Sequence, residues 1–289
     1  MNEIAILIIA HKNQHQLELL LRSLADDFDL YVHIDKTSAI NKEELAVKYP
    51  KIRFYSKLHV VWGGYNLSAC SLFLFQQAYK GNYKYYALIS GQDIPVITNE
   101  KIKDFIYKND SSYIVSDKLP IKHWAYNGGI NRYELYWGHD ITGNSLWDTF
   151  RRKLIGNIRK IQLKYNIRRS FYKGMDVYGG SNWGLLKQDA MSYLISFIDK
   201  NPGFMKRLKY CFCTDELWIQ TILATSNCKI KNEHFTYLDW GTGPEYPRTL
   251  RMEDYNKIVE SPYPFARKFD SEVDNEIIEK LLNSRNSNR

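Results

Sequence analysis

Apolar and polar positions alternate in blocks along the first 115 residues of the chain. Short apolar runs bounded by polar residues are typical of buried strands, and apolar residues at helical spacing are typical of helices packed on a core. We expect strands at about 3–10, 30–35, 52–55, 85–90 and 112–115. We expect helices at about 14–25, 66–80 and 99–108. This order predicts an α/β fold with a mainly parallel sheet flanked by helices.

The second half of the chain has a less regular pattern. An aromatic, glycine-rich stretch covers 123–143. Beyond it we expect a strand at about 178–186, helices at about 188–200 and 214–225, and a C-terminal helix from about 272. No linker-like or repetitive segment interrupts the sequence, so we treat 1–289 as a single domain.

Polar residues follow the predicted strands at their carboxyl ends. They are His33, Asp35, Ser90, Gln92 and Asp93. Ligands of parallel α/β sheets bind beyond these strand ends, so the side chains are candidates for a binding site. A dinucleotide-dependent oxidoreductase is not expected, because Ala10-His11-Lys12-Asn13 stands where a glycine-rich phosphate loop would follow the first strand.

Positive charge is concentrated in one segment. The chain has a net charge of +8. Segment 151–173 has nine Lys and Arg residues and no acid, with Leu154, Ile158 and Ile161 at helical spacing. A basic amphipathic helix suits an anionic membrane surface or a polyphosphate ligand, and a solvated basic face is an equally good interpretation. We expect no nucleic acid partner, because no nucleic-acid-binding motif accompanies the charge.

The four cysteines show no C-x-x-C pair, which predicts neither a zinc site nor a disulfide framework and fits a reducing compartment. The apolar N-terminus is short and lacks a basic leader, so we interpret it as a strand. No segment is long enough to span a membrane. We therefore expect a cytoplasmic protein.

The most informative local feature is a pair of acids, Asp215 and Glu216, that opens an otherwise apolar helix containing Leu217, Trp218 and Ile219. A carboxylate at the rim of an apolar core can act as a general base. On local grounds alone, an N-cap and a first-turn acid are the commoner explanation. The decision depends on motifs elsewhere in the chain.

Seven blocks between residues 3 and 270 resemble, in order, the motifs of the core-2/I-branching enzymes, glycosyltransferase family 14. They are Tyr31-Val32-His33-Ile34-Asp35, Val61-Trp62-Gly63-Gly64-Tyr65, Ile89-Ser90-Gly91-Gln92-Asp93-Ile94-Pro95, Gly180-Ser181-Asn182-Trp183, the Asp215-Glu216 helix, Asp239-Trp240 and Arg267-Lys268-Phe269-Asp270. The resemblance implies a GT-A-like, Rossmann-like fold, a nucleotide-sugar donor and inversion at the anomeric carbon. It also implies a nucleotide-sugar-binding half at 3–115 and an acceptor and catalytic half at 116–270, followed by a C-terminal helix and tail at 271–289.

The resemblance also assigns roles to residues. Glu216 matches the catalytic base, and Arg248 and Lys268 match phosphate-binding cations. The donor site would include Ile8, His33, Asp35, Trp62, Gly63, Gln92 and Asp93. The acceptor site would include Arg132, Glu134 and Trp240. A core tryptophan before a turn remains an alternative for Trp62, and an Asx turn before Pro95 remains one for Asp93.

We expect no metal cofactor. Most GT-A enzymes hold a metal with a D-x-D motif at a central strand end, and here that end reads Ser90-Gly91-Gln92-Asp93, with one acid. Asp27-Phe28-Asp29 precedes the second strand and is better explained as a turn. Fixed cations such as Arg248 and Lys268 would stabilise the departing diphosphate electrostatically instead.

The resemblance predicts transfer of N-acetylglucosamine from a UDP-sugar to a glycan hydroxyl. UDP-xylose or UDP-glucuronate is an alternative donor, and an inactive nucleotide- or sugar-binding protein is the non-enzyme alternative. The sequence lacks the anchor and disulfide cysteines of the animal members. We therefore expect a bacterial enzyme of surface-polysaccharide synthesis. Its acceptor would be a glycan or lipid-linked glycan, and segment 151–173 would face the inner leaflet of the cytoplasmic membrane.

Overall fold

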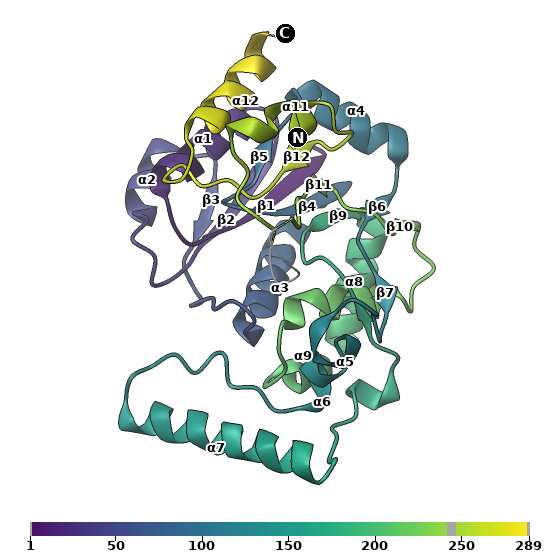
Figure 1. The fold of residues 1–289 in the computed structure, drawn as a ribbon. Helices are drawn as coiled ribbons and strands as arrows, with labels where there is room; N and C mark the ends of the chain where they lie inside the picture. The colour runs from purple at the N-terminus through teal and green to yellow at the C-terminus, as the bar shows by residue number, and fades with distance from the viewer. Residues whose placement is uncertain (1, 242–246, 288–289) are drawn as a thin grey trace.

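The computed structural model describes residues 2–241 and 247–287, with side chains as far as Arg285. Residues 242–246, which follow the Asp239-Trp240 motif, and the end of the predicted tail 271–289 lie outside these residues. A seven-stranded sheet forms the centre of the molecule (Figure 1). Its order is β10 (Ile230–Lys231), β6 (Ser112–Tyr113), β9 (Gly184–Lys187), β4 (Tyr85–Ser90), β1 (Ile4–Ala10), β2 (Asp29–Ile34) and β3 (Arg53–Tyr55).

The sheet is mainly parallel, as predicted. Strand β1 pairs in parallel with β2 and β4, and β2 pairs in parallel with β3. Strand β9 is antiparallel to both β4 and β6. The α/β class with a mainly parallel sheet flanked by helices is therefore confirmed.

Side-chain alternation along β1 divides the core between the two faces of the sheet. Ala5, Leu7 and Ile9 belong to one apolar cluster. That cluster also contains buried residues of α3 (Tyr65–Tyr79), α8 (Gln188–Lys200) and α10 (Trp218–Leu223). The next residues along the strand, including Ile6 and Ile8, join the opposite cluster with α1 (Gln14–Leu24) and α4 (Asn99–Asn109). Since both faces are covered, every residue of β1 is buried.

A second, three-stranded sheet lies beside the central one and leads into the site. It consists of β5 (Ile94–Pro95), β12 (Phe265–Ala266) and β11 (Thr236–Tyr237). Strand β5 directly follows Asp93, and β12 directly precedes Arg267. The antiparallel pairing of Ala266 with Ile94 therefore brings the end of β4 next to the 267–270 segment. Helices α11 (Tyr255–Val259) and α12 (Glu276–Ser287) pack near this sheet, with Ile258, Ile277 and Leu281 in a third cluster.

The remaining elements are short, apart from α7. They are α2 (Lys42–Lys48), β7 (Asp117–Lys118), α5 (Ala125–Gly128), α6 (Asn131–Glu134), the 3-10 turn η1 (Tyr172–Gly174), β8 (Tyr178–Gly179), α9 (Gly203–Leu208) and the 3-10 turns η2 (Thr214–Glu216) and η3 (Met252–Asp254). Helix α7 (Leu146–Lys164) lies at one extremity of the molecule, far from the central sheet (Figure 1). Among the described residues, no helix combines the length and apolarity that crossing a bilayer requires.

Three predicted elements have different bounds. The strand expected at 178–186 is two strands, because β8 pairs with β7 and only β9 joins the central sheet. The helix expected at 214–225 begins at Trp218, after the separate turn η2. The C-terminal helix begins at Glu276 rather than at 272. The Asp274 carboxylate accepts the backbone N–H of Ile277, in the first turn of this helix.

Gly180 occupies the break between β8 and β9, where no side chain fits. A Cβ there would lie 1.8 Å from the carbonyl oxygen of Val115. Gly180 also donates its N–H to the carbonyl oxygen of Glu216 at 2.9 Å. Gly180 therefore links the backbone of Glu216, the candidate base, to the segment between β8 and β9.

We predict that Gly180→Ala lowers stability, because the backbone must shift to relieve this clash at a cost of about 1–3 kcal/mol. The measurement is the urea midpoint of unfolding. Gly156→Ala is a matched control, because a Cβ at Gly156 in α7 meets no atom within 4 Å. It should be neutral or stabilising by up to about 1 kcal/mol, since Ala favours helix over Gly. Equal midpoints for Gly180→Ala and wild type would contradict the tight approach.

Candidate active site

Turn η2, which carries Asp215 and Glu216, is fixed by three separate parts of the chain. The Thr214 hydroxyl lies 2.6 Å from that of Ser68 on α3. The N–H of Cys213 donates to the carbonyl oxygen of Gly63 at 2.9 Å, and Gly180 holds the carbonyl of Glu216. Because these contacts restrain the backbone, the position of the Glu216 carboxylate is set by the fold.

Glu216 forms an ion pair with Arg132. The distance from Arg132 Nη1 to Glu216 Oε2 is 2.5 Å, and the two side chains are 12% and 31% exposed, respectively. The Arg132 guanidinium also lies 4.0 Å from the ring centroid of Trp124. A stacked, largely buried arginine is held in one orientation. The pair therefore fixes the carboxylate while leaving part of it open to solvent.

A second arginine lies near this pair. Arg267 is largely buried, with its Nε 3.9 Å from Asp93 Oδ1 and its guanidinium 4.4 Å from the ring centroid of Trp183. Burial lowers the pKa of Arg267, while Asp93, Asp215 and Glu216 oppose that shift as nearby negative charges. The site is thus a cluster of three acids and two arginines in a poorly solvated region.

Burial sets the proton affinities of the acids. It raises the pKa of Asp215 to about 7, and the nearby charge of Glu216 adds to the increase. Burial also raises the pKa of Glu216, although the charge and hydrogen bond of Arg132 work in the opposite direction. A carboxylate with a raised pKa is a better proton acceptor than an ordinary glutamate. This arrangement can remove a proton from a hydroxyl that reaches the exposed side of Glu216.

Several buried polar atoms in these segments have no hydrogen-bond partner within the part of the chain that the structure describes. They are Asp93 Oδ1, Arg132 Nε, Asn182 Nδ2, Asp215 Oδ1 and Arg267 Nε. Most buried polar groups in proteins have partners, so a group of such atoms indicates a site for a polar ligand or for water.

The two predicted phosphate-binding cations lie on adjoining loops, joined by a 2.9 Å hydrogen bond from the N–H of Leu250 to the carbonyl oxygen of Lys268. Arg248 is engaged by carboxylates: its Nε lies 2.8 Å from Asp239, and its Nη2 pairs with Asp254. Burial, then the charges of Arg267 and Lys12, lower the pKa of Lys268. Both assignments remain predictions.

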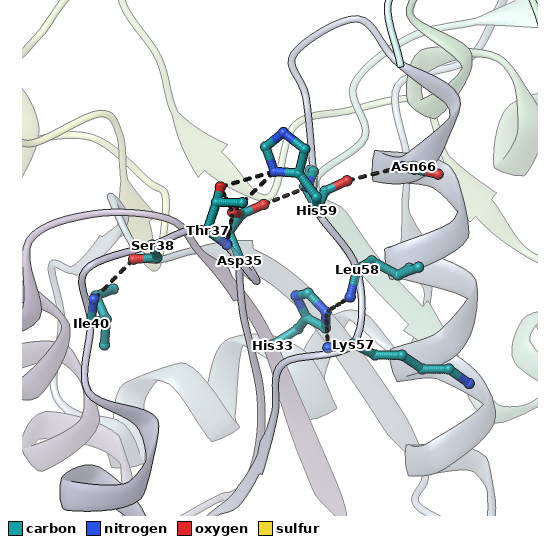
Figure 2. A network of polar contacts seen from close by, with 10 residues as sticks. His33, Asp35, Thr37, Ser38, Ile40, Lys57, Leu58, His59 and Asn66 are labelled. Carbon is teal, nitrogen blue, oxygen red and sulfur yellow. Dashed lines mark hydrogen bonds and ion pairs between the residues drawn. The ribbon is translucent and has the colours of Figure 1, made fainter. Parts of the chain in front are cut away.

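Asp35 is the centre of a polar network at the end of β2 (Figure 2). Its carboxylate accepts hydrogen bonds from the N–H and hydroxyl of Thr37 at 2.8 and 2.6 Å and from the N–H of Val60, and it lies 3.3 Å from His59 Nδ1. Burial would raise the pKa of Asp35, but these hydrogen bonds keep it below its ordinary value. Asp35 therefore orders the loop that leads to Trp62.

His33 holds the same loop from inside the protein. Its Nε2 accepts the backbone N–H groups of Lys57 and Leu58, each at 3.1 Å (Figure 2). Burial lowers the pKa of His33 to about 4, so the ring is neutral at physiological pH. Its side chain is fully buried, as is that of Ile8 in the core. Their predicted place at the donor site is untested, and the contacts of His33 show it supporting the backbone.

The other predicted donor residues lie around the site. Trp62 is 56% exposed and meets Phe212 edge to face, with ring centroids 5.5 Å apart. Gly63, at φ 71°, leaves no room for a side chain, since a Cβ would lie 2.4 Å from Phe212. Gln92 is hydrogen-bonded through its Nε2 to the carbonyl oxygen of Phe269 at 3.2 Å. Asp93 accepts from the N–H and hydroxyl of Ser90, at 2.7 and 2.6 Å.

The predicted acceptor residues separate in the structure. Arg132 joins the candidate base, whereas Glu134 pairs with Arg168 at 3.4 Å, beyond the other end of α6. Trp240 is 45% exposed at the edge of the described loop. Sequence reasoning assigned Arg132 to the acceptor and missed its contact with Glu216, because the two residues are 84 positions apart.

Sequence reasoning also missed Arg267 and treated Asp215 mainly as a helix cap. Arg267 precedes Lys268 in the Arg267-Lys268-Phe269-Asp270 motif. Only the fold shows that the Arg267 side chain turns toward Asp93. Among the described residues, no three His, Cys, Asp or Glu side chains are grouped in a way that could hold a metal ion. Metal independence remains a prediction.

The raised pKa of Asp215 predicts a pH-dependent stability. Its pKa rises on folding from 3.8 to about 7, so the folded state binds the proton more tightly and stability falls as pH rises through this window. The Asp215→Asn variant has no carboxyl group to titrate at this position. The stability of the variant relative to wild type should therefore increase from pH 4 to pH 7 by an amount on the order of a few kcal/mol. Urea unfolding at several pH values measures this difference, with the exposed Asp104→Asn as control. A difference that is independent of pH would show that Asp215 is ionised throughout.

Comparison with known proteins supports the interpretation of the motifs. The family model described as Core-2/I-Branching enzyme matches residues 4–259. Xylosyltransferase 2 of Canis lupus familiaris is 24% identical, and the alignment covers 96% of this chain and 33% of that protein. Xylosyltransferase 1 of Homo sapiens is 22% identical, covering 96% and 30%. The chain thus spans about a third of the length of these curated relatives.

Solved structures show weaker similarity. Staphylococcus aureus TarS 1-349 is 14% identical with a TM-score of 0.39, covering 81% of this chain and 59% of that one. The same protein in complex with UDP gives a TM-score of 0.39 over 99% of this chain and 72% of that one. The family model covers most of the chain and includes the β1 to η2 framework described above. This chain therefore belongs to the Core-2/I-Branching enzyme family.

Proposed function

We propose that this chain is an inverting glycosyltransferase that moves a sugar from a UDP-sugar to a hydroxyl of a glycan acceptor. The observation that carries the proposal is the fixed pair of Glu216 and Arg132, 2.5 Å apart, at the edge of a buried charge cluster. Family membership supports the same conclusion. An ordinary first-turn acid needs no buried arginine partner and no three-point support of its turn.

The proposed reaction is a single displacement. The acceptor hydroxyl loses its proton to Glu216 as its oxygen attacks the anomeric carbon. The bond from that carbon to the UDP oxygen breaks, UDP leaves as the anion, and attack opposite the leaving group inverts the configuration. Arg132 holds the carboxylate in its ionised form and in place, which favours proton acceptance at the position where the hydroxyl must arrive.

We propose that fixed protein cations stabilise the leaving diphosphate, without a metal. Lys268 is the first candidate, since it lies near Lys12, which pairs with Asp270 at 2.6 Å. Asp35 and Lys268 both act electrostatically on the imidazole of His11, whose pKa is lowered chiefly by burial. Their shared influence on His11 supports a donor site that contains both Lys268 and Asp35. Arg248 would contribute only if phosphate replaced part of its pairing with Asp239 and Asp254.

The donor sugar is a choice among three candidates. The core-2/I-branching resemblance favours UDP-N-acetylglucosamine. The curated relatives reported above are xylosyltransferases, which favours UDP-xylose. UDP-glucuronate is the third candidate donor. We propose a glycan or lipid-linked glycan of surface-polysaccharide synthesis as acceptor, which would bring the chain to the inner face of the cytoplasmic membrane.

The decisive test is turnover of Glu216→Gln. This change keeps the shape of the side chain and removes its basicity, so turnover should fall by about 10²–10⁴-fold while UDP affinity stays near wild type. UDP release with each of the three donors measures turnover, and calorimetry measures UDP affinity. The exposed Glu260→Gln, at the end of α11, is the matched control and should keep full activity.

The same assay separates the alternatives. Wild-type turnover in Glu216→Gln would reject this residue as the base. UDP binding without turnover of any donor would favour the inactive binding protein. Activity should also persist in EDTA, and a complete loss restored by Mn²⁺ would contradict the metal-free mechanism.

A further inference from the structure

Helix α7 is attached to the protein through one side only. Four residues at helical spacing make the contacts. Arg152 donates to the carbonyl oxygens of Ile141 and Gly143 at 3.0 and 2.6 Å. Ile155 lies against Gly138, the Arg159 guanidinium lies 4.4 Å from the ring centroid of Trp137, and Gln162 accepts the N–H of Tyr136 at 2.9 Å. These contacts fix which face of α7 points away from the protein.

The outward face is apolar. Its exposed fractions are 92% for Leu146, 65% for Trp147, 53% for Phe150, 46% for Leu154 and 50% for Ile161. At about 100° per residue, these five side chains occupy an arc of about 100°, and Phe150, Leu154 and Ile161 fall within about 40° of one another. Trp147 and Phe150 stack, with ring centroids 5.5 Å apart. We call this set the α7 apolar face.

Positive charges border the α7 apolar face. On the helical wheel, Lys153, Lys160 and Lys164 lie along one edge and Arg151 along the other. The segment from 151 to 173 has no acid. The exposed Asn157 falls inside the same arc and interrupts the strip. Soluble proteins seldom expose so many large apolar side chains together unless they meet a partner. An apolar strip edged by lysine matches the interface of an anionic bilayer, where apolar groups enter the acyl boundary and cations stay among the headgroups.

We propose that α7 docks the protein on an anionic membrane, lying in the plane of the surface with the α7 apolar face inserted. The sequence predicted a basic amphipathic helix within 151–173, with Leu154, Ile158 and Ile161 at helical spacing. The structure extends the exposed apolar residues toward the N-terminus, to Leu146, Trp147 and Phe150. The partner is an anionic lipid surface, selected by charge complementarity over a second copy of this chain, whose α7 would bring a like charge.

The docking surface is connected to the candidate active site by one short helix. Gln162 donates to the backbone carbonyl of Glu134 at 3.1 Å, and Arg168 pairs with its carboxylate. Glu134 ends α6, and Arg132 on the same helix holds Glu216. A membrane at α7 would therefore lie on the side of α6 away from the base. This inference does not depend on transferase activity.

The test is sedimentation of the full chain with vesicles of phosphatidylcholine alone or mixed with phosphatidylglycerol, without donor or acceptor. Wild type should bind the anionic vesicles, and added salt should weaken binding because exposed charges are screened over about 8–10 Å. The triple change Trp147→Ser, Phe150→Ser and Leu154→Ser should weaken binding by about tenfold or more, as should Lys153→Glu, Lys160→Glu and Lys164→Glu.

Controls match each change. Val47→Ser removes an apolar side chain that is 84% exposed on α2, and Lys51→Glu, Lys108→Glu and Lys209→Glu reverse three exposed charges elsewhere. Both should bind like wild type, and urea midpoints verify that every variant is folded. Equal binding to neutral and anionic vesicles, or unchanged binding of both α7 variants, would overturn the proposal. A wild-type dimer that the serine variant converts to monomer, without a vesicle effect, would assign the face to a second copy instead.

Discussion

The ion pair between Arg132 and Glu216 is the interaction on which the rest of the site depends. Burial makes an isolated carboxylate costly to ionise, and a buried arginine is equally costly without a partner. Each charge therefore requires the other. Arg267 is buried as well, and its charge is compensated by Asp93, Asp215 and Glu216. Removing one member leaves an uncompensated charge in a poorly solvated region. The cluster is a means of holding a reactive carboxylate at a defined position, more than a source of stability.

The fold supplies this cluster from distant segments. Strand β4 provides Asp93 through the turn that follows it, α6 provides Arg132, η2 provides both remaining acids, and the end of β12 provides Arg267. The small sheet that joins β5 to β12 closes the group. Gly63 and Gly180 hydrogen-bond to the backbone of Cys213 and Glu216 at positions where a side chain would clash with Phe212 and Val115, respectively. The polar network of Asp35 and His33 then orders the loop before Trp62. Segments that are far apart in the sequence therefore each contribute residues to one site.

The sequence predicted the regular part of this arrangement well. Strands β1, β2 and β4 have strong apolar runs, and the motif order identified the family and singled out Glu216. It could not predict that β8 and β9 are separate, because the steric approach of Gly180 to Val115 is a tertiary contact. It could not pair Arg132 with Glu216 or turn Arg267 toward Asp93, since long-range contacts leave no local pattern. The apolar face of α7 required knowing which side of the helix is attached.

The most direct test of this account is the pH dependence of kcat/KM in Arg132→Met. The acid limb of that profile reports the pKa of the base in the free enzyme. Arg132 lowers the pKa of Glu216 through its charge and its hydrogen bond, so the variant's acid limb should move to higher pH. Arg22→Met, which removes an exposed arginine paired with Glu18, should leave the limb unchanged. An acid limb at the wild-type position in Arg132→Met would contradict the claim that this pair controls the base.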